Sequence, residues 1–336
     1  MSECRIGDFC EKIKEMCGAA ECRSFSGRVE SITALFESIE LGPKDCVYLS
    51  ALASSEVVRA ILNFGAVPVF CDVMPDSFTI DHRSLDYQVK QTINVDQLYP
   101  RAVIADDFCG MPFSLKAVKD ICDRMGLILI EDCGRGFGGS WEGKACGTMG
   151  DYTLISLGES SVFGTGGSGC LVLAGKGNNM ENHIRACDGG GYQTADDIYA
   201  AQLGDSVTRL PETLALAAKS FSHIAAIMTE SDFWLQRGSG RQKSSCAGTV
   251  VTAQGEAQCE AALASFEAAG LSRYARRLHV HRKSCFEHGC RGLKNIENAS
   301  AVAPRSFEVD ILGAVNSGKF EELAAEMEYI ARNIHA

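Results

Sequence analysis

Three segments carry side chains whose types and positions suit chemistry. Asp132 follows the apolar run 127–130 after Glu131, Ser156 opens a segment rich in Ser and Gly that extends to Gly169, and Ser26-Gly27-Arg28 lies at the start of a helical pattern. A strand-end carboxylate can bind a cation, whereas hydroxyls and the free N–H groups of a helix start can bind an anion such as phosphate. Each segment also has an ordinary structural role, as a helix cap or a turn. Their functional interest depends on whether the fold brings them together.

Alternating strand and helix patterns would position these segments. Apolar residues recur at helical spacing over 27–39, and short apolar runs bounded by Gly, Pro or Asp are typical of buried strands. Strands joined by helices predict an α/β fold whose sheet is mostly parallel, with helices on both faces. In such sheets ligands bind beyond the carboxyl ends of the strands, where Asp132 and Ser156 lie. We expect helices at 27–39, 56–64 and 115–125 and strands at 47–49, 67–71, 101–105, 126–130, 152–157 and 170–173.

Composition excludes several classes of function. The 336 residues carry 32 Lys and Arg against 43 Asp and Glu, and the resulting formal charge of -11 disfavours nucleic acid and anionic membrane surfaces as partners. The sequence has no apolar run long enough to span a membrane, and residues 1–10 lack the pattern of a signal peptide. We therefore expect a cytoplasmic protein that binds neither nucleic acid nor membranes.

The cysteines and histidines favour packing over metal binding. The 16 cysteines are spread over a chain that can form a large core, so we expect reduced thiols at small apolar positions. The densest cluster lacks paired CxxC spacing and continues a helix-like stretch at 272–286, so no metal site is expected there. This cluster consists of His279, His281, Cys285, His288 and Cys290.

Longer motifs within residues 20–175 follow a pattern shared by one protein family. They are Leu41-Gly-Pro-Lys-Asp-Cys-Val47, Ala60 to Asp81 with its Gly-Ala-Val-Pro-Val-Phe-Cys-Asp-Val core, Phe108-Cys-Gly-Met-Pro112, Ile130-Glu-Asp-Cys-Gly134 and Trp141 to Asp151. The resemblance that these motifs carry is to the DegT/DnrJ/StrS family of PLP-dependent sugar aminotransferases. It implies the fold-type I large domain, with a mostly parallel seven-stranded-type sheet, and a shortened C-terminal small domain. We expect the large domain at 1–257, with a divergent segment at 194–257, and the C-terminal helix and small domain at 258–336.

The resemblance assigns roles to the three segments. Asp132 matches the carboxylate that faces the pyridine nitrogen of PLP and keeps it protonated. Ser156 and Ser26-Gly27 match groups that hold the cofactor phosphate. Arg28 stands where the family has threonine, and Arg135 stands where it has glutamine. PLP or PMP is thus the implied cofactor, held non-covalently if it binds.

The lysine of the family's Schiff base is missing from its expected place. It should lie five residues after Ser156, where this chain has Ser161. A serine cannot form an imine, and its hydroxyl is a poor base, so both the aldimine and the proton transfer lose their agent. The aromatic residue that would stack on the ring is also absent from 52–55. We expect neither Lys144 nor Lys176 near the ring, and we expect Cys133 to be a small core residue. Glu159 lies near the missing lysine and could act as a base if burial raises its pKa.

The C-terminal part departs furthest from the family. Gln258 to Phe266 resembles the helix after the family's N-Y-R-M-x-E segment, which places extra sequence at 194–255, with a helix around 210–228 and a loop at 237–248. An alternative places 209–212 on that motif. A last helix presents an apolar face made by Phe320, Leu323, Met327, Ile330 and Ile334.

Three hypotheses of function follow. The chain is a non-catalytic relative that dimerises through the inherited fold, either with itself or with an active paralogue. Alternatively, it is an active PLP- or PMP-dependent aminotransferase or dehydratase on a nucleotide-sugar, with another group in the lysine's role. The third hypothesis is a protein that binds a small anionic ligand through Arg28, Arg135 and Ser156. The resemblance implies a dimer, and the sequence names no substrate.

Overall fold

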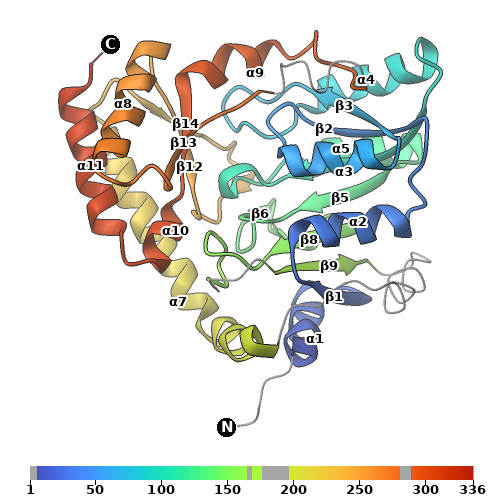
Figure 1. The fold of residues 1–336 in the computed structure, drawn as a ribbon, viewed down its shortest axis with the longest axis horizontal. Helices are drawn as coiled ribbons and strands as arrows, with labels where there is room; N and C mark the ends of the chain where they lie inside the picture. The colour runs from blue at the N-terminus through green and yellow to red at the C-terminus, as the bar shows by residue number, and fades with distance from the viewer. Residues whose placement is uncertain (1–5, 165–168, 176–196, 281–288, 336) are drawn as a thin grey trace.

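The computed structural model describes residues 6–164, 169–175, 197–280 and 289–335. It shows a large α/β unit and a smaller unit built on a second sheet (Figure 1).

The large unit is built on a seven-stranded sheet with the order β1-β9-β8-β5-β4-β2-β3. Neighbouring strands from β3 to β8 are parallel, and β9 runs antiparallel to both β8 and β1. The prediction of a mostly parallel seven-stranded sheet is therefore confirmed. The strands are β1 (Glu21–Phe25), β2 (Asp45–Ser50), β3 (Val67–Cys71), β4 (Tyr99–Asp106), β5 (Ile128–Asp132), β8 (Tyr152–Ser156) and β9 (Cys170–Ala174).

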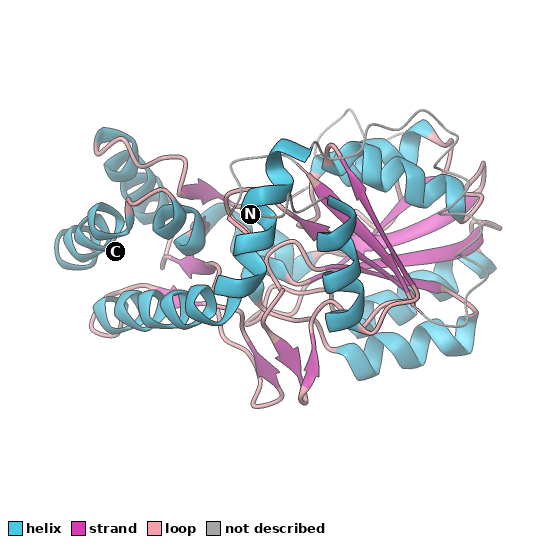
Figure 2. Ribbon diagram, turned by 90° about the horizontal axis from the view of Figure 1, so that it is seen from below, coloured by secondary structure: helices cyan, strands magenta, loops and turns pink. Residues whose placement is uncertain are grey.

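Helices cover both faces of this sheet, as Figure 2 shows. Successive residues of a strand point to opposite faces, so Cys46 and Tyr48 of β2 pack in one core cluster while Val47 and Leu49 pack in the other. The first cluster also takes the buried faces of α1, α4 and α5, and the second takes those of α2 and α3. These helices are α1 (Ile6–Cys17), α2 (Arg28–Ser38), α3 (Ser55–Asn63), α4 (His82–Asn94) and α5 (Leu115–Met125), with the short 3-10 helix η1 (Phe108–Gly110) after β4.

The smaller unit is built on an antiparallel sheet with the order β10-β12-β14-β13. Its strands are β10 (Trp234–Leu235), β12 (Thr249–Thr252), β13 (Ala275–Arg277) and β14 (Ser306–Val309). The other elements after residue 255 are α8 (Glu256–Ala268), α9 (Glu297–Val302), η3 (Ala303–Arg305), α10 (Ile311–Asn316) and α11 (Phe320–Asn333). Strands from both sides of the predicted boundary at 257 and 258 join this sheet, and the division of the chain there stays a prediction.

The long helix α7 (Asp197–Met228) connects the two units. Leu203, Leu210 and Ala217 belong to a core cluster of the large unit, whereas Ile224 and Met228 belong to the core of the smaller one. A second connection is a three-stranded sheet of β11 (Gln242–Lys243), β6 (Ser140–Trp141) and β7 (Lys144–Ala145). The predicted loop at 237–248 therefore contains a short strand that pairs with the large unit.

Most predicted elements are present, and one is wrong. Every helix and strand predicted between residues 27 and 173 has a counterpart within about two residues at each end. The described part of the helix-like stretch, residues 272–280, contains strand β13 at 275–277 instead, because Ala275 is buried in the smaller core and the segment pairs with β14. The sequence analysis did not nominate α1, β1 or α4.

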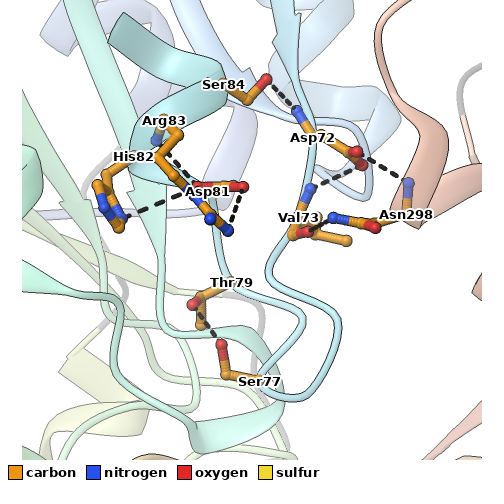
Figure 3. Close-up of polar contacts among 9 residues, drawn as sticks. All are labelled: Asp72, Val73, Ser77, Thr79, Asp81, His82, Arg83, Ser84 and Asn298. Atoms are coloured by element: carbon orange, nitrogen blue, oxygen red, sulfur yellow. Dashed lines mark hydrogen bonds and ion pairs between the residues drawn. The ribbon is translucent and has the colours of Figure 1, made fainter.

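The segment between β3 and α4 makes polar contacts with the start of α9 (Figure 3). The Asp72 carboxylate accepts hydrogen bonds from the backbone N–H groups of Asn298 and Ala299, each at 2.8 Å, at the start of α9. Asp81 caps α4 by accepting from the Arg83 N–H at 2.9 Å. Both carboxylates satisfy helix N-termini that would otherwise lack acceptors. This part of the family-like motif therefore has a folding role.

Two further expectations concern the whole chain. The thirteen cysteines within the described ranges are free, and most are buried. Among the described helices, each is too short or too polar to cross a bilayer.

Candidate functional site

A cavity of about 530 Å³ lies at the carboxyl ends of β4, β5 and β8, where the sheet meets the smaller unit. It adjoins the place where strand order reverses around β2, which is where open α/β sheets bind ligands. The side chains around it are mostly charged or hydroxylated: Arg28, Ser54, Asp106, Asp107, Asp132, Arg135, Ser156, Glu159, Ser160, Ser161, Arg276 and Glu308, with Leu52, Phe108 and Cys109 as the larger apolar ones.

Arg28 and Asp132 form the central ion pair of the cavity. Arg28 is the first residue of α2, and Asp132 is the last residue of β5. The Nη1 atom donates to Oδ1 of Asp132 at 3.0 Å, and Nη2 donates to Oδ2, so both carboxylate oxygens are engaged by one guanidinium. Burial opposes the charge of Arg28, but the neighbouring Asp132 outweighs it and raises the pKa of Arg28. The pair is the bidentate geometry that arginine and carboxylate favour.

Asp106 lies beside Asp132, as its register partner on the adjacent strand β4. Its Oδ1 atom is buried and has no hydrogen-bond partner within the described part of the chain. Burial, and secondly the charge of Asp132, raise the pKa of Asp106 to about 7. Asp132 is therefore paired with a cation, whereas its neighbour Asp106 titrates near neutral pH.

A second ion pair joins the two units across the cavity. Arg135 donates through Nη2 to Oε2 of Glu308 on β14 at 2.8 Å, and Nε of Arg276 on β13 lies 3.2 Å from Oε1 of Glu308. Burial opposes ionisation of Glu308, but the two guanidiniums outweigh it and lower its pKa. Arg135 thus binds a carboxylate of the smaller unit.

Ser161 lies in a turn that is held by the smaller unit. The side chain is buried, and its Oγ accepts a hydrogen bond from the Phe163 N–H at 3.2 Å. Asn316 of α10 donates through Nδ2 to the carbonyl oxygens of Glu159, at 2.7 Å, and Ser161, at 3.3 Å. Next to it, the Ser160 hydroxyl bonds to Asp310. The segment expected to carry the lysine is therefore a structural contact between the units.

The other predicted site residues divide into two groups. Ser156 lines the cavity, and its Oγ accepts from the Gly158 N–H at 3.4 Å. Ser26 and Gly27 precede α2 and are not part of the lining, although Gly27 is the N-cap of that helix. The cavity thus brings together Arg28, Asp132, Arg135, Ser156 and Ser161, and their roles toward a cofactor stay predictions.

The groups considered as substitutes for the lysine lie elsewhere or are engaged. Lys144 is exposed on β7, and Cys133 is fully buried outside the lining, where burial raises its pKa well above the ordinary thiol value. Glu159 lines the cavity but pairs with Arg273. Lys176 lies outside the described residues, as do the cluster members His281, Cys285 and His288. Among the lining side chains that the structure describes there is no lysine.

One buried group of potential metal ligands lies near the cavity. Atoms of Asp107, Glu131 and Cys146 lie within 4.8 Å of one another. Both oxygens of Glu131 already accept backbone hydrogen bonds, from Gly147 at 2.7 Å and Met149 at 2.8 Å. We therefore assign this group to the folding of the turn at 147–150.

The sequence analysis missed several lining residues. Asp106 could have been found, because it ends a predicted strand just as Asp132 does. Phe108 is part of the family-like motif at 108–112, which by itself indicated no role in a site. Arg276 and Glu308 had no signal, since they reach the cavity from strands of the smaller sheet.

The family assignment follows from comparison with known proteins. Residues 4–327 match the model of the DegT/DnrJ/EryC1/StrS aminotransferase family. This chain belongs to that family. It is 31% identical to the L-glutamine:2-deoxy-scyllo-inosose aminotransferase of Streptomyces kanamyceticus over 52% of this chain and 39% of that protein. It is also 33% identical to the dTDP-4-dehydro-2,3,6-trideoxy-D-glucose 4-aminotransferase of Saccharopolyspora spinosa over 40% of this chain and 34% of that protein. The matched part spans about two-fifths or less of these relatives.

Solved structures share the fold. A DegT DnrJ EryC1 StrS aminotransferase from Brucella abortus superposes with a TM-score of 0.85 at 17% identity, over 99% of this chain and 91% of that one. The 3-amino-5-hydroxybenzoic acid synthase gives a TM-score of 0.83 at 16% identity, over 97% and 90%. The fold-type I architecture is thus retained across the chain, and the family is one of PLP-dependent enzymes.

Proposed function

We propose that this family member no longer carries out transamination through a lysine Schiff base and acts as a non-catalytic relative of the sugar aminotransferases. Ser161 is the observation that carries the proposal. Its side chain has no amine, and its hydroxyl oxygen is occupied by a backbone N–H. A serine held in this way supplies neither an imine nor a base to a carbonyl compound.

The lining residues do not fit a covalently held PLP. That cofactor needs a primary amine beside it and a carboxylate free to face its ring nitrogen. The described lining contains no lysine, and both oxygens of Asp132 are engaged by Arg28. We therefore derive no step of a reaction through PLP at this site.

Trapping of a Schiff base tests the proposal. The purified protein would be mixed with PLP, its visible absorbance recorded, and the mixture treated with borohydride and mapped by mass spectrometry over the whole chain. We expect only substoichiometric labelling of exposed lysines, and the Lys144→Arg variant removes one of these as a matched control. A single lysine reduced in stoichiometric yield would contradict the proposal and identify the missing amine.

Anion binding has less support than it had from the sequence. The hypothesis needs unpaired positive charge, yet Arg28 pairs with Asp132, and Arg135 and Arg276 both contact Glu308. Burial of positive charge next to carboxylates leaves little attraction for a phosphate.

We propose, from family membership, that the chain forms a dimer with itself or with an active paralogue. Light scattering of the purified chain separates the two cases, since a homodimer has twice the 36.1 kDa of one chain. A monomer at micromolar concentration would leave only the paralogue as partner, and failure to co-purify with it would contradict the proposal.

A further inference from the structure

We infer that Arg28 is an internal cation which occupies the carboxylate of Asp132 and so closes the cavity to pyridine-ring ligands, whether or not a lysine is present. It thereby deepens the proposed function, on which it rests: Ser161 removes covalent attachment, and Arg28 removes the ion pair that would remain for a non-covalent ligand.

The contact engages the whole carboxylate. Nη1 and Nη2 of Arg28 each meet a different oxygen of Asp132, and the two side chains are only 23% and 12% exposed. A planar guanidinium fork matches a carboxylate in shape, and a ring nitrogen with a single N–H could replace at most one of its two bonds. An entering pyridinium would therefore have to displace a better partner.

The backbone of Arg28 is held in place. Its carbonyl oxygen accepts from the Ser31 hydroxyl at 2.7 Å, and Gly27, just before it, accepts from the Ser31 N–H at 3.2 Å. The Nε atom of Arg28 also lies 3.7 Å from Oε2 of Glu56 on α3. Displacement would have to come from rotation of the side chain alone.

Rotation away from Asp132 is unfavourable for two electrostatic reasons. Arg28 lies at the N-terminus of α2, where the helix dipole repels a cation, so its charge depends on nearby carboxylates. Asp132 would then lie beside Asp106 on the adjacent strand without the guanidinium that neutralises its charge, so the two carboxylates would repel each other. The charged groups that line the cavity together with Asp132 include Arg28 of α2, Asp106 of β4 and Arg135 after β5.

The charge of residue 28, rather than its size, should then determine how tightly a pyridine-ring ligand binds. Arg28→Gln removes the charge and keeps a donor for one oxygen of Asp132, whereas Arg28→Lys keeps the charge. Without Arg28 a pyridinium would not have to displace a guanidinium from Asp132. Its binding should therefore be stronger by about 10- to 100-fold. The probe is pyridoxine 5′-phosphate, which has no aldehyde and so cannot label any lysine.

Calorimetric titration of the full chain tests this expectation. We expect weak binding to the wild type and to Arg28→Lys, and binding at least about tenfold tighter to Arg28→Gln. Arg124→Gln, which breaks an exposed pair with Asp86, is the matched control and should bind like the wild type. Equal affinity in the wild type and Arg28→Gln would overturn the inference. Because the probe forms no imine, this result is independent of the borohydride test of Ser161.

A second measurement on the wild type covers the case in which Arg28→Gln does not fold. The guanidinium NMR signals of Arg28 should be protected from solvent exchange and should not move when pyridoxine 5′-phosphate is added in excess. Displacement of these signals by the probe would show that the ion pair opens for a pyridine ring, and would overturn the inference.

Discussion

Two regions of the large unit place carboxylates just after strands, and they use them differently. Beyond β3, at the edge of the sheet, Asp72 accepts backbone N–H groups of α9 and Asp81 caps α4 (Figure 3). Beyond β5, in the middle of the sheet, Asp132 borders a cavity and pairs with Arg28. Both regions contain residues of the family-like motifs, but the cavity also contains Ser161 and Arg28, where the resemblance implies a lysine and a threonine.

The comparison implies that Asp132 now has a structural role like that of Asp72. Asp132→Ala would leave the half-buried Arg28 without its main partner at a helix N-terminus, and we expect a loss of about 3 kcal/mol in the free energy of unfolding. Urea denaturation measures this loss. The double variant Arg28→Gln with Asp132→Asn, which removes both charges, should lose less than Asp132→Ala. A loss below about 1 kcal/mol for Asp132→Ala would show that the cavity pair is not structural.

Asp72 tests the edge region. Asp72→Ala would remove the acceptor for the N–H groups of Val73, Asn298 and Ala299, and we expect a loss of about 2 kcal/mol in the free energy of unfolding. The exposed neighbour Asp76→Ala is the matched control and should change stability by less than about 0.5 kcal/mol. Equal effects of the two substitutions would remove the distinction between the regions.

Asp106, in the cavity, should make the stability of the folded protein depend on pH. Its pKa in the folded protein is about 7, above that of an unfolded aspartate, so the native state binds more protons between about pH 4 and 7. Stability should therefore fall as pH rises through this window, by about 2 kcal/mol after allowance for partial exposure. Asp106→Asn should flatten the difference in unfolding free energy between pH 5 and 8. An unchanged slope in this variant would assign the pH dependence to other groups.

The smallest expected effect concerns the contact between the units at Ser161. Asn316→Ala removes the donor to the carbonyl groups of Glu159 and Ser161, and we expect a loss of about 1 kcal/mol in the free energy of unfolding. Hydrogen exchange should accelerate at the amides of 158–164 more than elsewhere. Asn333→Ala, whose side chain bonds to Tyr329 of its own helix, is the matched control and should leave exchange in that turn unchanged.

Much of the large unit could be predicted because its patterns are local. The helix at 115–125 was predicted with the observed ends, since Gly126 terminates it in a left-handed conformation. The smaller sheet could not be predicted in this way, because β13 and β14 have three and four residues and carry no clear alternation. The apolar face predicted for α11 does contain its buried residues Leu323, Met327 and Ile330.

Within the candidate site, too, only the residues with a local sequence signal could be predicted. The strand-end rule identified Asp132 and Ser156, and it would have identified Asp106 if it had been applied to β4 as well. It could not identify Glu308, which reaches the cavity across 173 residues of sequence to meet Arg135.

The sequence by itself determined that residue 161 has no amine and that Arg28 replaces a threonine of the family pattern, because side-chain chemistry belongs to the residue type wherever it lies. Only the tertiary structure decided that Arg28 neutralises Asp132, 104 residues away, and that Arg135 is paired with the smaller unit. Ion pairs depend on distances of a few ångströms between separate elements, and those distances are set by how α2 and β14 pack against the ends of the central strands.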